Sequence, residues 1–159
     1  MDVEKSMDDN ITMQNMKTAY QIIEDGIRDL DNKSFQMISI LGIMMTVQVT
    51  VLPNTVTAIG AVFLLFSLIS YFISALLFIK SCIIKEYKIY PTNESVCYHY
   101  EYDVSLDDYV SGAVGDYDEA IEYNRRIIHE KGVDSRYAFY FFILGLFLTI
   151  LTVGSIVIA

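Results

Sequence analysis

Hydrophobic positions gather in long uninterrupted runs along this chain, and charged positions lie between the runs. No Asp, Glu, Lys, Arg or His occurs from Phe35 to Ile79, a stretch of 45 residues that is divided by Pro53. A helix of a soluble protein needs a polar face, so a charge-free stretch of this length is typical of membrane proteins. Phe35–Leu52 and Thr57–Ile79 each reach the length of about 18 residues that a membrane span requires.

A third charge-free run covers Tyr137–Ala159. The pattern therefore predicts an all-α membrane protein with three transmembrane helices, a long N-terminal cytoplasmic helix and a helical cytoplasmic insertion. The first run contains Gln36 and Gln48, and we expect it to depend on its partner in the hairpin. Four segments follow: a cytoplasmic amphipathic helix (1–34), a transmembrane hairpin (35–79), a cytoplasmic insertion (80–136) and a third transmembrane helix (137–159).

A heptad pattern precedes the first run. Apolar residues alternate at spacings of three and four and predict a helix seam, which packs either within the chain or between chains of a homo-oligomer. No Pro or Gly lies between Asp31 and Phe35, so the pattern favours one continuous helix from about residue 10 to 52, with a kink near Asn32 as the alternative. The seam residues are Met13, Met16, Tyr20, Ile23, Ile27 and Leu30.

The insertion contains a second amphipathic pattern. Asp116 and Glu119 have the spacing of a capping box, and Gly132 can close the helix, so a separate helix is predicted from Asp116 to Lys131. Its apolar face should pack against the N-terminal seam. Residues 91–115 are rich in Tyr, Asp and Ser and are expected to be mostly irregular.

The basic residues predict the topology. All 11 Lys and Arg residues lie before the first run or between the second and third runs. Because basic residues collect on the cytoplasmic side, we expect a multi-pass protein of the inner cell membrane with a cytoplasmic N-terminus and an external C-terminus. Lys33 and Lys80, at the inner ends of the first two runs, are predicted to anchor the protein at the surface of the lipid bilayer.

Several classes of function are disfavoured. A net charge of −9 argues against a nucleic acid polymer as partner. Cys97 and His99 are the strongest metal candidates, but a zinc site needs three or four protein ligands. No phosphate-binding or nucleophile motif is present. We therefore expect no enzyme activity, no catalytic residue, no metal and no cofactor.

Polar residues within the first run allow two interpretations. Ser39, Thr46 and Gln48 either belong to faces through which membrane helices pack, or they edge a polar path between subunits. The runs hold no ionisable side chain except tyrosine, which makes a proton-coupled or ion-coupled transporter unexpected.

Several short motifs together resemble a known family. They are Asp31-Asn-Lys-Ser34 before the hairpin, Pro91 after it, Ala120-Ile-Glu-Tyr-Asn124 with Ile127-Ile128 and Lys131-Gly132, and an aromatic third run with Gly145. This combination resembles the transmembrane effector module of the Pycsar anti-phage defence system and its uncharacterised relatives. The resemblance implies an effector that impairs the inner membrane when a cyclic pyrimidine mononucleotide is sensed. Residues 91–115 do not resemble a nucleotide-binding domain, so a separate sensor protein is expected.

Two functions are consistent with these patterns. The first is an oligomeric integral membrane effector of a stress or phage-defence system that perturbs membrane integrity on signal. The alternative is a non-enzymatic scaffold or accessory subunit of a membrane complex, whose cytoplasmic seam binds another protein.

Overall fold

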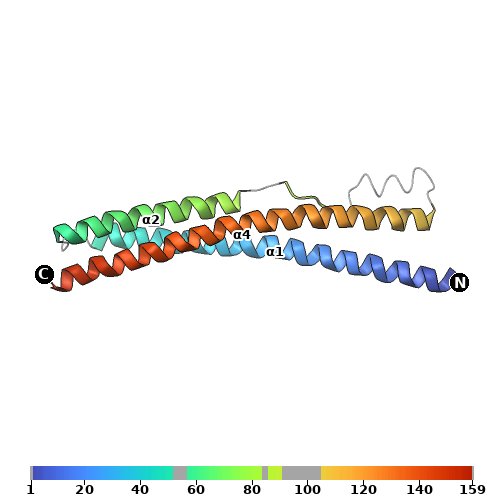
Figure 1. Cartoon of the computed structure of the whole chain (residues 1–159), viewed down its shortest axis with the longest axis horizontal. Coiled ribbons are helices and arrows are strands. Elements are labelled where there is room, and N and C mark those ends of the chain that lie inside the picture. Colours follow the sequence, from blue (N-terminus) through green and yellow to red (C-terminus); the bar gives the residue numbers. More distant parts are fainter. Residues whose placement is uncertain (1, 52–56, 84–85, 91–104, 159) are drawn as a thin grey trace. The chain divides into compact units, whose positions relative to one another are not determined.

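The structure is a computed structural model that describes residues 2–51, 57–83, 86–90 and 105–158. Three helices account for most of these residues: α1 (Asp2–Val51), α2 (Ala58–Cys82) and α4 (Leu106–Ile158) (Figure 1). No strand occurs within the described ranges, so the predicted all-α class is confirmed.

The first helix is continuous over 50 residues. The sequence favours this outcome over a kink near Asn32 because no proline occurs before Pro53. Gly26 and Gly42 lie within α1, and a helical glycine costs about 1 kcal/mol, which packing easily offsets.

The prediction of a separate helix from Asp116 to Lys131 is wrong. A single helix, α4, runs over 53 residues and passes through Gly132 without ending. Its cap lies at Ser105, whose Oγ accepts a bond from the Asp108 N–H at 3.2 Å and donates to Asp108 Oδ2 at 2.6 Å. A glycine without a following proline does not end a helix that is packed on both sides of it.

Two described segments are long and apolar enough to cross a membrane, namely α2 and the part of α4 from Asp108 to Val157. Of the three membrane helices predicted, two therefore pass this test within the described residues, and α1 does not. Gln36 and Gln48 lower the apolar character of α1, and the end of the expected first span lies outside the described residues.

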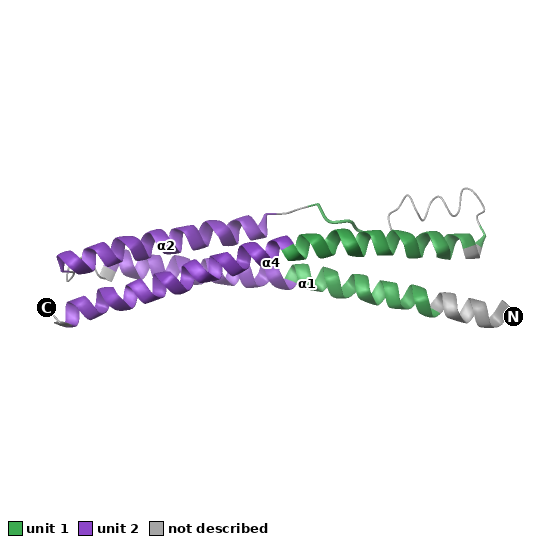
Figure 2. Cartoon of the chain, viewed as in Figure 1, with its two compact units in different colours: residues 1–28, 85–129 green, residues 29–84, 130–159 purple. Residues whose placement is uncertain are grey.

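The chain divides into two compact units (Figure 2). Unit 1 comprises Met1–Arg28 and Lys85–His129, and unit 2 comprises Asp29–Ile84 and Glu130–Ala159. Each unit has a hydrophobic core of its own. Helices α1 and α4 contribute to both units, whereas α2 belongs to unit 2 alone.

In unit 1 the heptad seam of α1 packs within the chain. Tyr20 and Ile23 are buried against Tyr117, Ala120 and Ile121 of α4. Met13 and Met16 pack at the edge of this cluster, and Ile27 is also buried. The rings of Tyr20 and Tyr117 meet edge to face with centroids 5.8 Å apart. The structure thus places the N-terminal seam against the second amphipathic pattern, as expected, and does so inside one protomer.

A buried asparagine attaches residues 86–90 to α4. The Asn124 side chain is 1% exposed; its Nδ2 donates to the Lys88 carbonyl at 2.9 Å, and its Oδ1 accepts from the Lys88 N–H at 3.0 Å. The Tyr20 hydroxyl donates to the same carbonyl at 3.0 Å. The ring of Tyr90 lies 4.4 Å from that of Tyr117, centroid to centroid. These contacts close the core of unit 1.

Alkaline pH should destabilise unit 1. Burial raises the pKa of the Tyr20 hydroxyl above its ordinary value of 10.0, and burial likewise raises the pKa of Tyr117. The folded state therefore retains these protons when the unfolded chain has begun to lose them. Stability is unaffected below about pH 10 and falls as the pH rises above it.

Thermal unfolding followed by circular dichroism at pH 9 and pH 11 checks this expectation. A double variant, Tyr20→Phe with Tyr117→Phe, removes both titrations and should lose less stability over that interval than the wild type. An equal loss in the two proteins would show that other groups cause the alkaline effect.

Candidate functional site: two polar layers inside unit 2

Unit 2 is a bundle of three helices, formed by α2 and the parts of α1 and α4 that lie in this unit (Figure 2). Its apolar core contains Leu41, Tyr71, Phe78 and Ala138, all at most 3% exposed. The contacts of α1 with α4 join residues 100 or 101 positions apart, so these two helices run parallel. Helix α2 runs antiparallel to both, because its later residues contact earlier residues of α4.

A row of serines fastens α2 to α4. Small side chains allow the two backbones to approach closely, and each hydroxyl bonds to a main-chain carbonyl that is otherwise occupied only by its own helix. The bonds are Ser67 Oγ to Gly145 O (3.1 Å), Ser70 to Phe141 (2.7 Å), Ser74 to Ala138 (2.7 Å) and Ser81 to Lys131 (3.2 Å).

A polar cluster lies within the apolar core, and we call it the core polar layer: Gln48, Ser67, Tyr71 and Thr149. Gln48 is 1% exposed, and its Nε2 donates to Ser67 Oγ at 2.9 Å and also to Thr149 Oγ1. The hydroxyls of Tyr71 and Thr149 are 3.1 Å apart. All three helices of unit 2 contribute to this layer, so its bonds connect the whole bundle.

A second cluster, the inner polar layer, contains Asp31, Ser34, Ser81, Lys131 and Ser135. Lys131 is 4% exposed, and its Nζ lies 2.6 Å from Asp31 Oδ1. The Ser135 hydroxyl lies 2.9 Å from that of Ser81 and 3.5 Å from that of Ser34. This layer again connects all three helices, and it does so where the charge-free runs begin.

The structure separates the three residues of the predicted polar path. Ser39 Oγ donates to the Phe35 carbonyl at 3.1 Å and Thr46 Oγ1 to the Gly42 carbonyl at 2.8 Å, and both side chains are exposed on α1. Gln48 lies about 200° around the helix from Thr46, since each residue turns the helix by about 100°. Gln48 therefore faces the bundle interior, while Ser39 and Thr46 satisfy their hydroxyls on the outer surface.

The predicted anchors have different surroundings. Lys80 Nζ pairs with Asp134 Oδ1 at 2.9 Å, and the Lys80 side chain is exposed. Lys33 is exposed and lines a cavity of unit 2. Their role as membrane anchors stays a prediction. Cys97 and His99 lie outside the described residues.

Sequence reasoning missed three polar residues of α4, namely Lys131, Ser135 and Thr149. A signal for the first was present, because Asp31 and Lys131 carry opposite charges and lie four and six residues before charge-free runs. Had the first and third runs been aligned as parallel helices, the two charges would have met. No comparable signal distinguishes Thr149 from other threonines in an apolar run.

The core polar layer contains hydroxyls and one amide. It offers hydrogen bonds to water or to another chain, and its members supply neither a carboxylate nor an imidazole for proton transfer. A family model, the Pycsar effector protein domain, matches residues 15–159. The chain belongs to the Pycsar effector family. No curated protein and no solved structure matches the chain.

Membership in the Pycsar effector family confirms the resemblance drawn from the sequence. Together with the two apolar helices, it identifies a membrane protein of an anti-phage defence system, in which a cyclic nucleotide is the implied signal. The motif residues that carried the resemblance have a structural role in this Pycsar effector domain. Ala120, Ile121, Asn124 and Ile127 are all at most 8% exposed in the core of unit 1.

Proposed function

We propose that the chain is an oligomeric effector that perturbs the inner membrane when the defence signal arrives. The observation that carries this proposal is the core polar layer, which is enclosed by helices whose outer faces are apolar. Gln48, Ser67 and Thr149 bond to one another inside one protomer. A protomer in this state presents no polar path to the bilayer and can reside in a membrane without harm.

The outer surface of unit 2 supports insertion of all three helices. Monomeric soluble proteins rarely expose contiguous apolar surface on this scale. The exposed residues include Ile40, Ile43 and Val47 on α1, so we propose that this part of α1 is a third span, held by its contacts with α2 and α4. Exposed apolar residues on the other two helices include Val62, Leu65, Phe66, Ile69, Phe72, Leu76, Phe139, Ile143, Leu144, Phe147 and Ile150.

The orientation we propose follows the basic residues, with unit 1 in the cytoplasm and the C-terminus outside. A separate sensor that binds the cyclic nucleotide would act on unit 1. Because α1 and α4 belong to both units, a change in their packing in unit 1 would also change how they pack in the three-helix bundle of unit 2.

Separation of the helices of unit 2 would deprive Gln48 of its partners. A polar group left unsatisfied in hydrocarbon costs several kcal/mol. Gln48, Ser67 and Thr149 would then recruit water or the same residues of neighbouring chains. Both outcomes create a polar path through the membrane, and the second also requires the oligomer that we propose.

One observation weakens the scaffold alternative. That function requires a cytoplasmic seam that is free to bind another protein. Tyr20 and Ile23, at the centre of the seam, are at most 9% exposed and already covered by α4. The membrane effector needs no free seam and is therefore favoured.

Inducible expression tests the proposal. Cells that express the chain together with its sensor and cyclic nucleotide should depolarise, as read by a membrane-potential dye. Gln48→Leu should lose most of the depolarisation, because it keeps the side-chain volume but removes the amide. Thr152→Val is the matched control, because the Thr152 hydroxyl is equally buried and bonds only to its own helix, at the Leu148 carbonyl (3.0 Å).

Two results would contradict the proposal. Equal depolarisation by the wild type and Gln48→Leu would remove the core polar layer from the mechanism. A membrane-inserted wild type that leaves the potential unchanged with the signal present, and that co-purifies with a stoichiometric partner, would favour the scaffold. Cross-linking in intact membranes before and after the signal measures the oligomer directly.

A further inference from the structure

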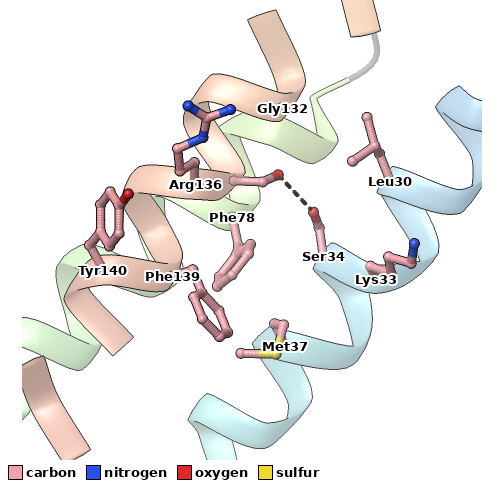
Figure 3. Close-up of a pocket in the computed structure, with 10 residues that line it drawn as sticks. Leu30, Lys33, Ser34, Met37, Phe78, Gly132, Arg136, Phe139 and Tyr140 are labelled. Atoms are coloured by element: carbon pink, nitrogen blue, oxygen red, sulfur yellow. Dashed lines mark hydrogen bonds between the residues drawn. The ribbon is translucent and has the colours of Figure 1, made fainter. Parts of the chain in front are cut away.

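A cavity of about 570 Å³ lies within unit 2, between α1 and α4 and beside Phe78 of α2 (Figure 3). The side chains of Met37, Phe78 and Phe139 point toward one another and form its apolar wall. Lys33 on α1 and Arg136 on α4 line the same cavity. A volume of this size accommodates a small molecule or part of a larger amphiphile.

The two cations of the cavity differ from the other cations of unit 2. Lys80 pairs with Asp134, and Lys131 pairs with Asp31. Among the described residues, no carboxylate lies within ion-pair distance of Lys33 or Arg136. The unit therefore neutralises two of its four cations internally and leaves the two beside the cavity available to an external anion.

The position of these cations relative to the apolar runs defines the ligand further. Lys33 lies two residues before the first run, and Arg136 directly precedes the third run at Tyr137. The contact between Ser34 and Ser135, 3.5 Å between hydroxyl oxygens, places the two cations within about 3 Å of one another along the axes of the parallel helices, since each residue adds about 1.5 Å. A ligand that bridges them has its anion where the charge-free runs begin and its remaining atoms against Met37 and Phe139, further along those runs.

We propose that this cavity binds one anionic phospholipid of the cytoplasmic leaflet. Its phosphate bridges Lys33 and Arg136 after the Arg136 side chain, which points away from Lys33 in Figure 3, turns toward the cavity, and the beginning of an acyl chain lies along Met37, Phe78 and Phe139. Basic pockets between membrane helices on the cytoplasmic side favour anionic headgroups, and an arginine guanidinium binds phosphate through two parallel bonds. A free phosphate ion would leave the apolar wall unused, so the wall selects a lipid. This proposal rests on the membrane location proposed above.

The bound lipid would join α1 to α4 at the inner polar layer. Helices α1 and α4, which already meet there through Ser34 and Ser135, would then also bind the same phosphate group. Occupancy of the cavity would hold the bundle in its packed state, so the lipid is a stabilising ligand of the resting effector.

The full chain in mild detergent provides the test, with native mass spectrometry and thermal shift as readouts. Short-chain phosphatidylglycerol should bind with one molecule per protomer and raise the melting temperature. Short-chain phosphatidylcholine and inorganic phosphate should do neither. Lys33→Gln and Arg136→Gln should each weaken phosphatidylglycerol binding by about tenfold, the effect of losing one charge-assisted bond. Both side chains are exposed, so neither variant disturbs the core.

Arg125→Gln is the charge-matched control, because Arg125 is exposed in unit 1 and should leave the affinity unchanged. Unchanged affinity in both cavity variants overturns the proposal. Equal stabilisation by inorganic phosphate also overturns the proposal and would indicate an anion site. A dimer that covers the cavity and binds no lipid would overturn it as well. A wild-type chain that binds no phosphatidylglycerol but still depolarises cells would reject the lipid site alone, whereas absence of the chain from the membrane fraction would reject the proposed function as well.

Discussion

Replacing Asp31 with alanine should destabilise unit 2 by about 3–5 kcal/mol, the cost of removing one partner from a buried ion pair. Lys131 is 4% exposed, and Asp31 Oδ1 lies 2.6 Å from its ammonium group. Without Asp31 the ammonium group stays buried with no anion beside it. Its surroundings are the hydroxyls of the inner polar layer, which cannot neutralise a full charge.

The measurement is unfolding of the full chain in mixed detergent micelles, followed by circular dichroism. Lys80→Ala is the matched control. The Lys80 side chain, which pairs with Asp134, is exposed to solvent, and ion pairs with an exposed partner contribute about 1 kcal/mol or less. A double variant, Asp31→Leu with Lys131→Met, removes both charges of the ion pair and should recover most of the stability that Asp31→Ala loses. A similar loss in Asp31→Ala and Lys80→Ala would show that the burial of Lys131 has no energetic consequence.

Gly145→Ala should destabilise the same bundle by about 1–3 kcal/mol, the usual cost of excess volume in a packed core. A Cβ at this position would lie 2.6, 2.7 and 3.0 Å from the Cε1, Cδ1 and Cζ atoms of Tyr71. The ring of Tyr71 is fully buried, so its displacement requires neighbouring side chains to move as well. Its displacement would also disturb the hydroxyl contact with Thr149, and with it the core polar layer.

Gly154→Ala is the control for helix propensity. It lies in the same apolar run of α4, and a Cβ there meets nothing within 4 Å. Alanine favours a helix over glycine by about 1 kcal/mol, so this variant should be neutral or slightly stabilising. Detergent unfolding of the two variants in parallel separates the steric effect from propensity. Equal stability of the two would mean that Tyr71 adapts at little cost.

The sequence predicts which segments form helices better than it predicts where those helices begin and end. The absence of proline before Pro53 correctly favoured one long α1. The same logic would have carried α4 through Gly132, because no proline follows it. At the other end, Asp116 and Glu119 imitate a capping box and suggested a start later than Leu106. The actual cap, Ser105 with Asp108, has the same spacing. Spacing alone cannot rank two such signals on one helix.

Helix pairing was only partly predictable. The seam through Tyr20 and Ile23 indicated a partner, and the second amphipathic pattern was the expected one, but the sequence left open whether the two meet in one chain. In unit 2, a helical projection alone separates Gln48 from Thr46. The projection does not identify the side chains that face Gln48, namely Ser67 and Thr149, because their positions depend on the register of three helices.

The row of serines on α2 has a consequence for how this family can vary. Ser70 and Ser74 bond to main-chain carbonyls of α4, whereas Ser67 and Ser81 also bond to the side chains of Thr149 and Ser135. Any residue supplies the required carbonyl, provided that α4 remains helical and the side chain at the point of contact is small enough. At Ser70 and Ser74, helix α2 thus recognises α4 as a helix and not as a sequence. A change of the α4 side chain at either contact that stays within this size limit leaves the bond between the two helices in place.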